Sequence, residues 1–270
     1  MGAFSSTDKT GGHSEDWLEK INLDLVDLNQ EFSSNLGADR FFGRFSREEM
    51  VSYLQEAHIF EALEARGYKN TQLQLEILSE MDNRIFIRSA RGELLVHMRL
   101  KMSDFQAKKW RESFRLVFID WLLTQNVKLG KTKHPEKLLK GQEYPGLSII
   151  AELTNFIRVL AKKMGAHGAF NVPEYFHDAV LFHRNFQFVD AEKEGVFRAI
   201  LSQFRSLGLR KLSNLIHSGK VMKESTEIYT WSYGEMLSCT DTYLNNLVFS
   251  NDYFDKVQRV KDSSRFKIIE

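Results

Sequence analysis

Residues 114–125, FRLVFIDWLLTQ, constrain the fold more than any other stretch of this sequence. They are apolar at odd and even positions alike and rich in β-branched and aromatic side chains, which is typical of a central strand covered on both faces. After a polar, lysine-rich segment, a helix-periodic run over 147–164 ends at Gly165 and leads to a second short apolar run, GAFNV, at 168–172. A strand, a helix and a strand in this order predict two parallel strands joined by a right-handed crossover.

An antiparallel meander of three strands is predicted upstream, over residues 71–100. Apolar and polar residues alternate with a period of two, and the joins MDNR and ARGE are short and rich in turn formers. The residues that set this period are Leu73, Leu75 and Ile77, then Ile85 and Ile87, then Leu94, Val96, Met98 and Leu100.

Helical spacing dominates the rest of the chain. Two amphipathic helices are predicted before the meander, one over 14–35 and one from Ser46, a typical N-cap, to Gly67, a typical C-cap. The apolar stripe of the first consists of Trp17, Ile21, Leu25, Leu28 and Phe32. Downstream we expect a helix over 174–184, a strand over 186–189 and a mainly helical region over 191–270.

These elements predict an α/β (α+β) fold, a central mixed sheet flanked by helices. We expect a disordered start at residues 1–13, one domain over 14–190, and a helical C-terminal extension over 191–270. Neither an internal repeat nor a low-complexity linker separates these parts, so the extension is expected to pack on the core.

Composition narrows the classes of partner. With 37 basic and 36 acidic residues and no run of five or six like charges, the sequence does not indicate a nucleic-acid or anionic membrane surface. The basic and aromatic stretch 105–115 is diluted by Asp104 and Glu112 and is interpreted as a solvated connection. The single Cys239 excludes an internal disulfide. No apolar run approaches the roughly 20 residues of a membrane helix, and the start lacks the blocks of a signal peptide. A cytoplasmic protein is expected.

The first residues leave one alternative open. Met1-Gly2 with Ser6 fits the short pattern for N-myristoylation, whereas the other interpretation is an unmodified start rich in serine, glycine and threonine. One acyl chain gives only marginal membrane binding, so neither interpretation predicts a membrane protein.

The order of elements resembles the GNAT superfamily of acyl-CoA-dependent N-acyltransferases, and a loop motif adds to the likeness. Members enter the crossover helix through R/Q-x-x-G-x-G/A. Here Gly146 and Ser148 occupy the small positions around Leu147, with Gln142 or Glu143 where a basic or amide residue is expected. The resemblance implies that backbone N–H groups of this loop and the helix dipole hold the pyrophosphate of acetyl-CoA or another acyl-CoA.

A second motif of the family, N-x-x-A-x-x-x-Y-x-x-x-G-F, is matched in part. Ala179 and Phe188 keep their positions, whereas Phe176, His183 and Gln187 replace the asparagine, tyrosine and glycine. That tyrosine often protonates the leaving thiolate, so the resemblance implies His183 as general acid in acyl transfer to an amine.

Several alternatives remain open. The departures from the two family motifs also fit a GNAT-like scaffold without catalytic activity. Such a scaffold would bind a protein partner through aromatic residues of its C-terminal part, Trp231, Tyr233 and Tyr243. Pro145 and Pro173 either shape a cofactor cleft or simply precede two helices.

Three further groups of residues allow a functional interpretation. Asp120 in the apolar strand either orients the acceptor amine or pairs with a helix-borne Lys or Arg. NVPEYF resembles the segment around the catalytic glutamate of nitrilase-type amidases, with Glu174 and Cys239 in order, but too little chain remains for that fold. The spacing of His134, His167, His177 and His183 does not indicate a metal site.

Overall fold

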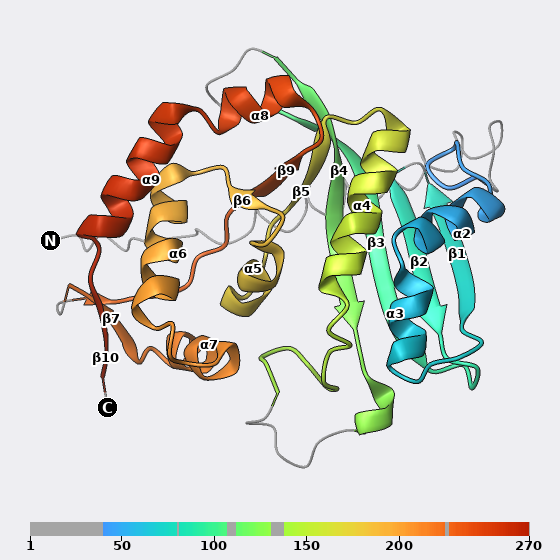
Figure 1. The fold of residues 1–270 in the computed structure, drawn as a ribbon, viewed down its shortest axis with the longest axis horizontal. Coiled ribbons are helices and arrows are strands. Elements are labelled where there is room, and N and C mark those ends of the chain that lie inside the picture. The colour runs from blue at the N-terminus through green and yellow to red at the C-terminus, as the bar shows by residue number, and fades with distance from the viewer. Residues whose placement is uncertain (1–39, 80, 107–111, 131–137, 225–226, 270) are drawn as a thin grey trace, which may run out of the picture.

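The computed structural model describes residues 40–79, 81–106, 112–130, 138–224 and 227–269, and the predicted helix over 14–35 lies outside them. Its main sheet has seven strands in the order β1-β2-β3-β4-β5-β9-β6 (Figure 1). The expectation of a mixed sheet flanked by helices is confirmed. In the described part of the chain, no helix has the length and apolar character needed to cross a bilayer.

The antiparallel meander is confirmed. It consists of β1 (Gln72–Ser79), β2 (Asp82–Arg88) and β3 (Leu94–Phe105). Leu75 pairs with Ile85, and Ile85 pairs with Met98, so these predicted apolar positions share one face. Ile85, Ile87, Val96, Met98 and Leu100 are fully buried, which fixes the register because a slip by one residue would expose them. The prediction is wrong for Leu94, which lies beyond a shift in the register and is only half-buried, whereas Leu95 is fully buried.

The strand, helix and strand around residue 150 are also confirmed. β4 (Phe114–Thr124) and β5 (Gly168–Asn171) are parallel, with Leu116 opposite Gly168 and Ile119 opposite Asn171. The crossover helix α4 (Ile150–Met164) begins three residues later than predicted and ends at Gly165, whose φ of 70° is the left-handed conformation that favours glycine.

The predicted helix over 46–67 is two helices, α2 (Arg47–Glu56) and α3 (Ile59–Ala65). Ser46 caps α2 as predicted, in a reciprocal capping box with Glu49. The break lies at His58, whose φ is 60°. Because Leu54 and Leu63 on either side are both buried, the apolar spacing alone concealed this break.

The described C-terminal part contributes both helices and strands. After α5 (Phe176–Phe182) and β6 (Gln187–Phe188) come α6 (Ala191–Gln203), α7 (Leu209–His217), α8 (Thr242–Val248) and α9 (Asn251–Ser263). A small second sheet has the order β10-β7-β8, formed by Phe266–Ile268, Val221–Lys223 and Glu227–Ile228. The sequence did not predict β9 (Met236–Cys239), which lies between β5 and β6 in the main sheet.

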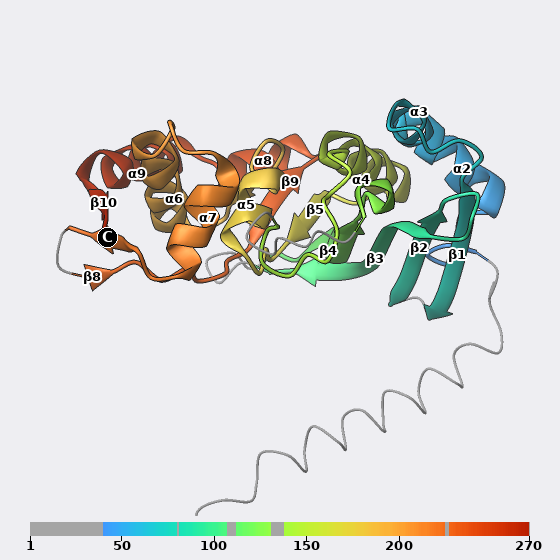
Figure 2. The same ribbon diagram turned by 90° about the horizontal axis from the view of Figure 1, so that it is seen from below.

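Helices cover one face of the meander. Figure 2 shows α2, α3 and α4 on the same side of β1 to β4. The expectation that β4 is covered on both faces is wrong for its second half. Val117 and Ile119 are buried, but Trp121 is 48% exposed. Polar and half-buried residues on the neighbouring strands therefore line a face that the described helices leave uncovered.

Candidate functional site

The loop over 143–148 lies at the carboxyl end of the parallel strand pair. β4 continues to Thr124, five residues beyond its last pairing with β5, and then turns through a short 3₁₀ segment, Val127–Leu129. Asn126 donates its N–H to the Pro145 carbonyl over 2.7 Å, and the Leu147 N–H donates to Thr124 Oγ1 over 3.4 Å. In open α/β sheets this edge is the usual place for a ligand.

Arg66, the C-cap residue of α3, shapes this loop from a position about 80 residues earlier in the chain. Its guanidinium donates to the carbonyls of Leu147 and Ser148 and to Ala62 O at 2.8 Å. In a trans peptide the N–H points away from the carbonyl, so the N–H groups of Ser148 and Ile149 are directed away from Arg66. Spacing gave no indication of Arg66, which fixes the orientation of these two peptides.

The backbone at this point forms a small concave surface of donors. Ser148 has a φ of 56° and Ile149 has φ −116° and ψ 24°, so φ changes sign between two successive residues. Successive residues of opposite hand aim their N–H groups to the same side and form an anion-binding nest. Within the described chain neither N–H has an acceptor.

The loop residues differ from expectation in detail. Ser148 does not cap α4, because Ile149 holds the N-cap position and no side chain bonds there. The positive φ lies at Ser148 rather than at Gly146. A Cβ on Gly146 would lie 3.5 Å from Thr124 Oγ1 and 3.9 Å from Gln142 Nε2, so Gln142 does lie beside the glycine. Leu147 is buried in the core, and Glu143 is exposed.

Asn171 ends β5 next to this loop-bearing edge. Its side chain is only 3% exposed, and its Oδ1 has no donor among the described residues. A buried carbonyl oxygen without a donor is costly, so an acceptor of this kind at the end of a parallel strand points to a ligand that brings an N–H group. A polar residue closing an apolar strand was the only indication that the sequence offered.

His183, the C-cap residue of α5, is held by a buried carboxylate. Its Nε2 lies 2.6 Å from Oε1 of Glu194, a residue of α6 that is fully buried. The same Oε1 accepts from Arg198 Nε at 2.6 Å, and Oε2 accepts from the Phe188 N–H at 3.0 Å. Burial alone would raise the pKa of Glu194, but these hydrogen bonds, led by that of His183, outweigh it and hold the pKa below its ordinary value. The carboxylate stays ionised, so Nε2 of His183 carries a hydrogen and Nδ1 is left for other partners.

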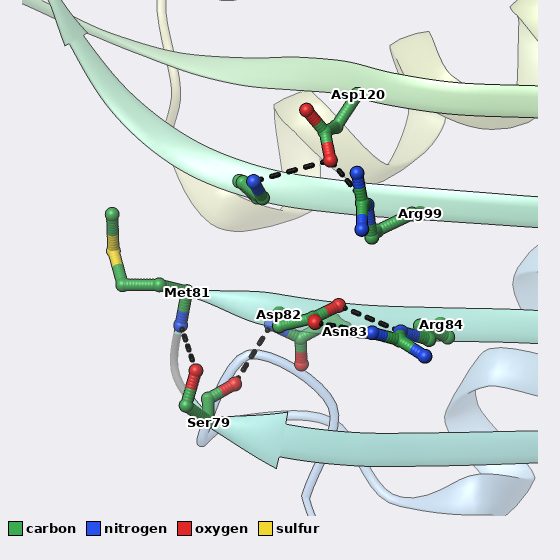
Figure 3. Close-up of polar contacts among 8 residues, drawn as sticks. Ser79, Met81, Asp82, Asn83, Arg84, Arg99 and Asp120 are labelled. Carbon is green, nitrogen blue, oxygen red and sulfur yellow. Dashed lines mark hydrogen bonds and ion pairs between the residues drawn. The ribbon is translucent and has the colours of Figure 1, made fainter. Parts of the chain in front are cut away.

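Asp120 lies apart from His183, on the sheet face opposite α4. It pairs with Arg99, and its Oδ2 is 3.1 Å from Lys101 Nζ (Figure 3). Both partners are on β3, so the pairing with a helix-borne cation is corrected to a pairing across two strands. The structure therefore places His183 and Asp120 on opposite sides of the sheet.

Other constellations do not form an accessible nucleophilic site. His177 Nδ1 lies 3.1 Å from Ser213 Oγ and its Nε2 lies 3.4 Å from Asp178 Oδ1, but Ser213 is fully buried. Burial lowers the pKa of His177 to about 4. Burial also raises the pKa of the Cys239 thiol to about 12, which leaves it unsuited to the nitrilase role. Within the described residues no three His, Cys, Asp or Glu side chains come together as a metal site.

No protein-family model matches the sequence, and no curated protein is significantly similar to it.

Proposed function

We propose that this protein is a GNAT-like acyltransferase that transfers the acyl group of an acyl-CoA to an amine. The proposal rests on one observation above all. The nest at Ser148 and Ile149 and the buried acceptor Asn171 Oδ1 both belong to the carboxyl edge of the parallel pair β4 and β5. The element order derived for the resemblance, from the helical region before β1 to β6, is also that of the described chain.

The residues present fit the chemistry of an acyl-CoA. Its pyrophosphate is an anion, which suits two N–H groups at the start of a helix, in peptides whose carbonyls Arg66 holds on the other side. Its pantetheine arm carries amide N–H groups, which suit the carbonyl oxygen of Asn171. Gly146, without a side chain, lets a ligand approach the backbone of this loop closely.

In the proposed reaction the amine nitrogen attacks the thioester carbonyl, a C–N bond forms and the C–S bond breaks. The imidazolium of His183 gives its Nδ1 proton to the departing thiolate, and the amine gives up a proton to water. Glu194 keeps the Nε2–H in place throughout, because its carboxylate can only accept.

Calorimetric titration with acetyl-CoA and with a longer acyl-CoA tests the binding step. We expect micromolar affinity for the full chain and at least about a tenfold loss, roughly 1.4 kcal/mol, in Gly146→Trp, whose ring would fill the approach to the nest. Gly208→Trp is the matched control, since nothing lies within 4 Å of a Cβ at Gly208. Absence of heat with both thioesters would refute the proposal and favour the scaffold without catalysis.

A further inference from the structure

The face of β1 to β4 opposite the helices carries exposed apolar and aromatic side chains. Trp121 is 48% exposed, and Leu78 and Met81 at the β1–β2 hairpin are 55% and 56% exposed. Phe86 stacks on His97 at 4.3 Å between ring centroids, and His97 lies 6.5 Å from Trp121. We name these five residues the open face. Clustered surface of this kind is typical of an interaction site.

Cations lie along the same face. Arg84, Arg99 and Lys101 alternate along β2 and β3 with the core residues. Arg84 pairs with Asp82, and Arg99 and Lys101 pair with Asp120, so these five side chains carry one net positive charge (Figure 3). Their aliphatic stems and charged heads suit a partner with an apolar stripe flanked by carboxylates.

The chain supplies such a partner. Residues 1–39 contain eight acidic and two basic side chains, whereas residues 40–270 contain 28 acidic and 35 basic ones. Within that acidic segment, residues 14–35 carry the apolar stripe of Trp17, Ile21, Leu25, Leu28 and Phe32 at helical spacing. The two parts of the sequence are therefore complementary in charge, and each has an apolar surface to bury.

The connection is short enough. Two residues after Arg40, the first described residue, the Phe42 N–H donates to Asn83 Oδ1 over 2.7 Å on the helix-covered side of β2. From there the connection to the open face has to pass around the edge strand β1. Five steps of extended chain reach about 17 Å from Arg40 to residue 35. A helix over 14–35 would be about 33 Å long, whereas four strands about 4.8 Å apart are roughly 14 Å across, so the helix can cross the open face completely.

We propose that residues 14–35 dock on the open face as an amphipathic helix of the same molecule, with the apolar stripe on the rings of Phe86, His97 and Trp121. The flanking carboxylates then face Arg84, Arg99 and Lys101. This inference is independent of the proposed acyltransferase function.

Hydrogen exchange followed by mass spectrometry on the full chain tests it. We expect amides 17–32 to exchange at least about tenfold more slowly than an unstructured peptide, in a monomer and independently of protein concentration. Leu28→Asp in the stripe and Trp121→Glu on the open face should each abolish this protection. Gln30→Asp, which the spacing puts opposite the stripe, and Tyr233→Glu, a 73% exposed site elsewhere, should leave it unchanged.

Met81→Glu provides a second substitution on the open face in case Trp121→Glu unfolds the sheet, which the exchange of β2 and β3 amides in the same data would reveal. Unprotected amides 17–32 in the native chain would overturn the inference. So would protection that survives both open-face substitutions in a folded sheet, or protection that rises with concentration alongside a dimer, which would mean that a second copy covers the face.

Discussion

At the scale of single residues, the polar contacts that matter most join positions that no local pattern connects. Arg66 lies about 80 residues from the loop carbonyls it binds, and Glu194 of α6 meets His183 only where the fold brings α6 to the end of α5, at the ring contact of His183 with Phe197. Sequence spacing indicated His183 and Gly146 through a family motif. It could not indicate their partners, because hydrogen bonds between distant segments depend on the tertiary fold.

Glu194 offers the sharpest test at this scale. Glu194→Gln should lower the free energy of unfolding by about 3 kcal/mol, because the amide leaves the donors of Arg198, His183 and Phe188 only partly satisfied in a buried site. Glu192→Gln is the control on the same helix. That glutamate is exposed, and its Oε2 forms an ion pair at the surface with Lys256 Nζ over 3.5 Å. Because ion pairs in water contribute little, the substitution should lower the free energy of unfolding, measured in urea, by less than about 0.5 kcal/mol.

The pH dependence of this effect has a definite sign. The pKa of Glu194 is lowered in the folded protein, so the carboxylate stabilises the fold above its ordinary pKa of 4.5, and this contribution disappears as the pH falls through the folded value. The difference in unfolding free energy between wild type and Glu194→Gln should therefore be largest near pH 7 and shrink below about pH 4.5. A difference that grows on acidification would contradict this assignment.

At the scale of secondary-structure elements, the sequence predicted those with a long and regular period. The meander has three strands of seven to twelve residues whose core positions alternate, and turn-forming residues mark its joins. β9 has four residues, too few for a period, and its place is decided by pairing with β5 and β6. β6 is shorter still, but the strand predicted over 186–189 contains it. The break between α2 and α3 was hidden because both helices bury the same apolar stripe.

That break predicts a stabilising substitution. His58 has a φ of 60°, precedes α3 as its N-cap and makes no capping hydrogen bond with its side chain. Asparagine tolerates the left-handed conformation and can cap a helix, so His58→Asn should raise the free energy of unfolding by about 0.5–1 kcal/mol. His58→Val, with a branched Cβ, should lower it by about 1 kcal/mol or more. The urea denaturation midpoints of the two variants measure this difference. Equal midpoints would contradict the prediction and show that the backbone at residue 58 adapts to either side chain.

The pairing of β9 with β5 predicts a second effect at the same scale. A Cβ on Gly168 would lie 2.3 Å from the Ser238 carbonyl oxygen and 3.0 Å from Cys239 Cα, and neither backbone atom can move without separating the strands. Gly168→Ala should therefore cost about 3 kcal/mol or more in denaturant unfolding. Gly208→Ala, where a Cβ meets nothing within 4 Å, should change stability by less than about 1 kcal/mol.

At the scale of the whole molecule, the described C-terminal part completes both the sheet and the core. β9 joins β5 to β6, and α9 packs along α6 (Figure 1). One buried cluster unites Phe105, Phe114 and Leu116 of β3 and β4 with Leu244 and Tyr253 of α8 and α9. The sequence suggested an extension added to a finished domain, because helical periodicity after residue 190 concealed the strand that enters the sheet.

A chain ended after Asp190 tests this dependence. It would lose β9 and the helices α6 to α9, expose Phe114 and Leu116 to water and leave β5 as an unprotected edge. We expect it to aggregate, or to lack a cooperative unfolding transition by circular dichroism. A chain ended after Arg265, which removes β10 from the small sheet alone, should stay monomeric and unfold cooperatively. If the shorter chain also unfolded cooperatively, residues up to 190 would form an independent domain, and β9 would be an addition to a sheet already stable without it.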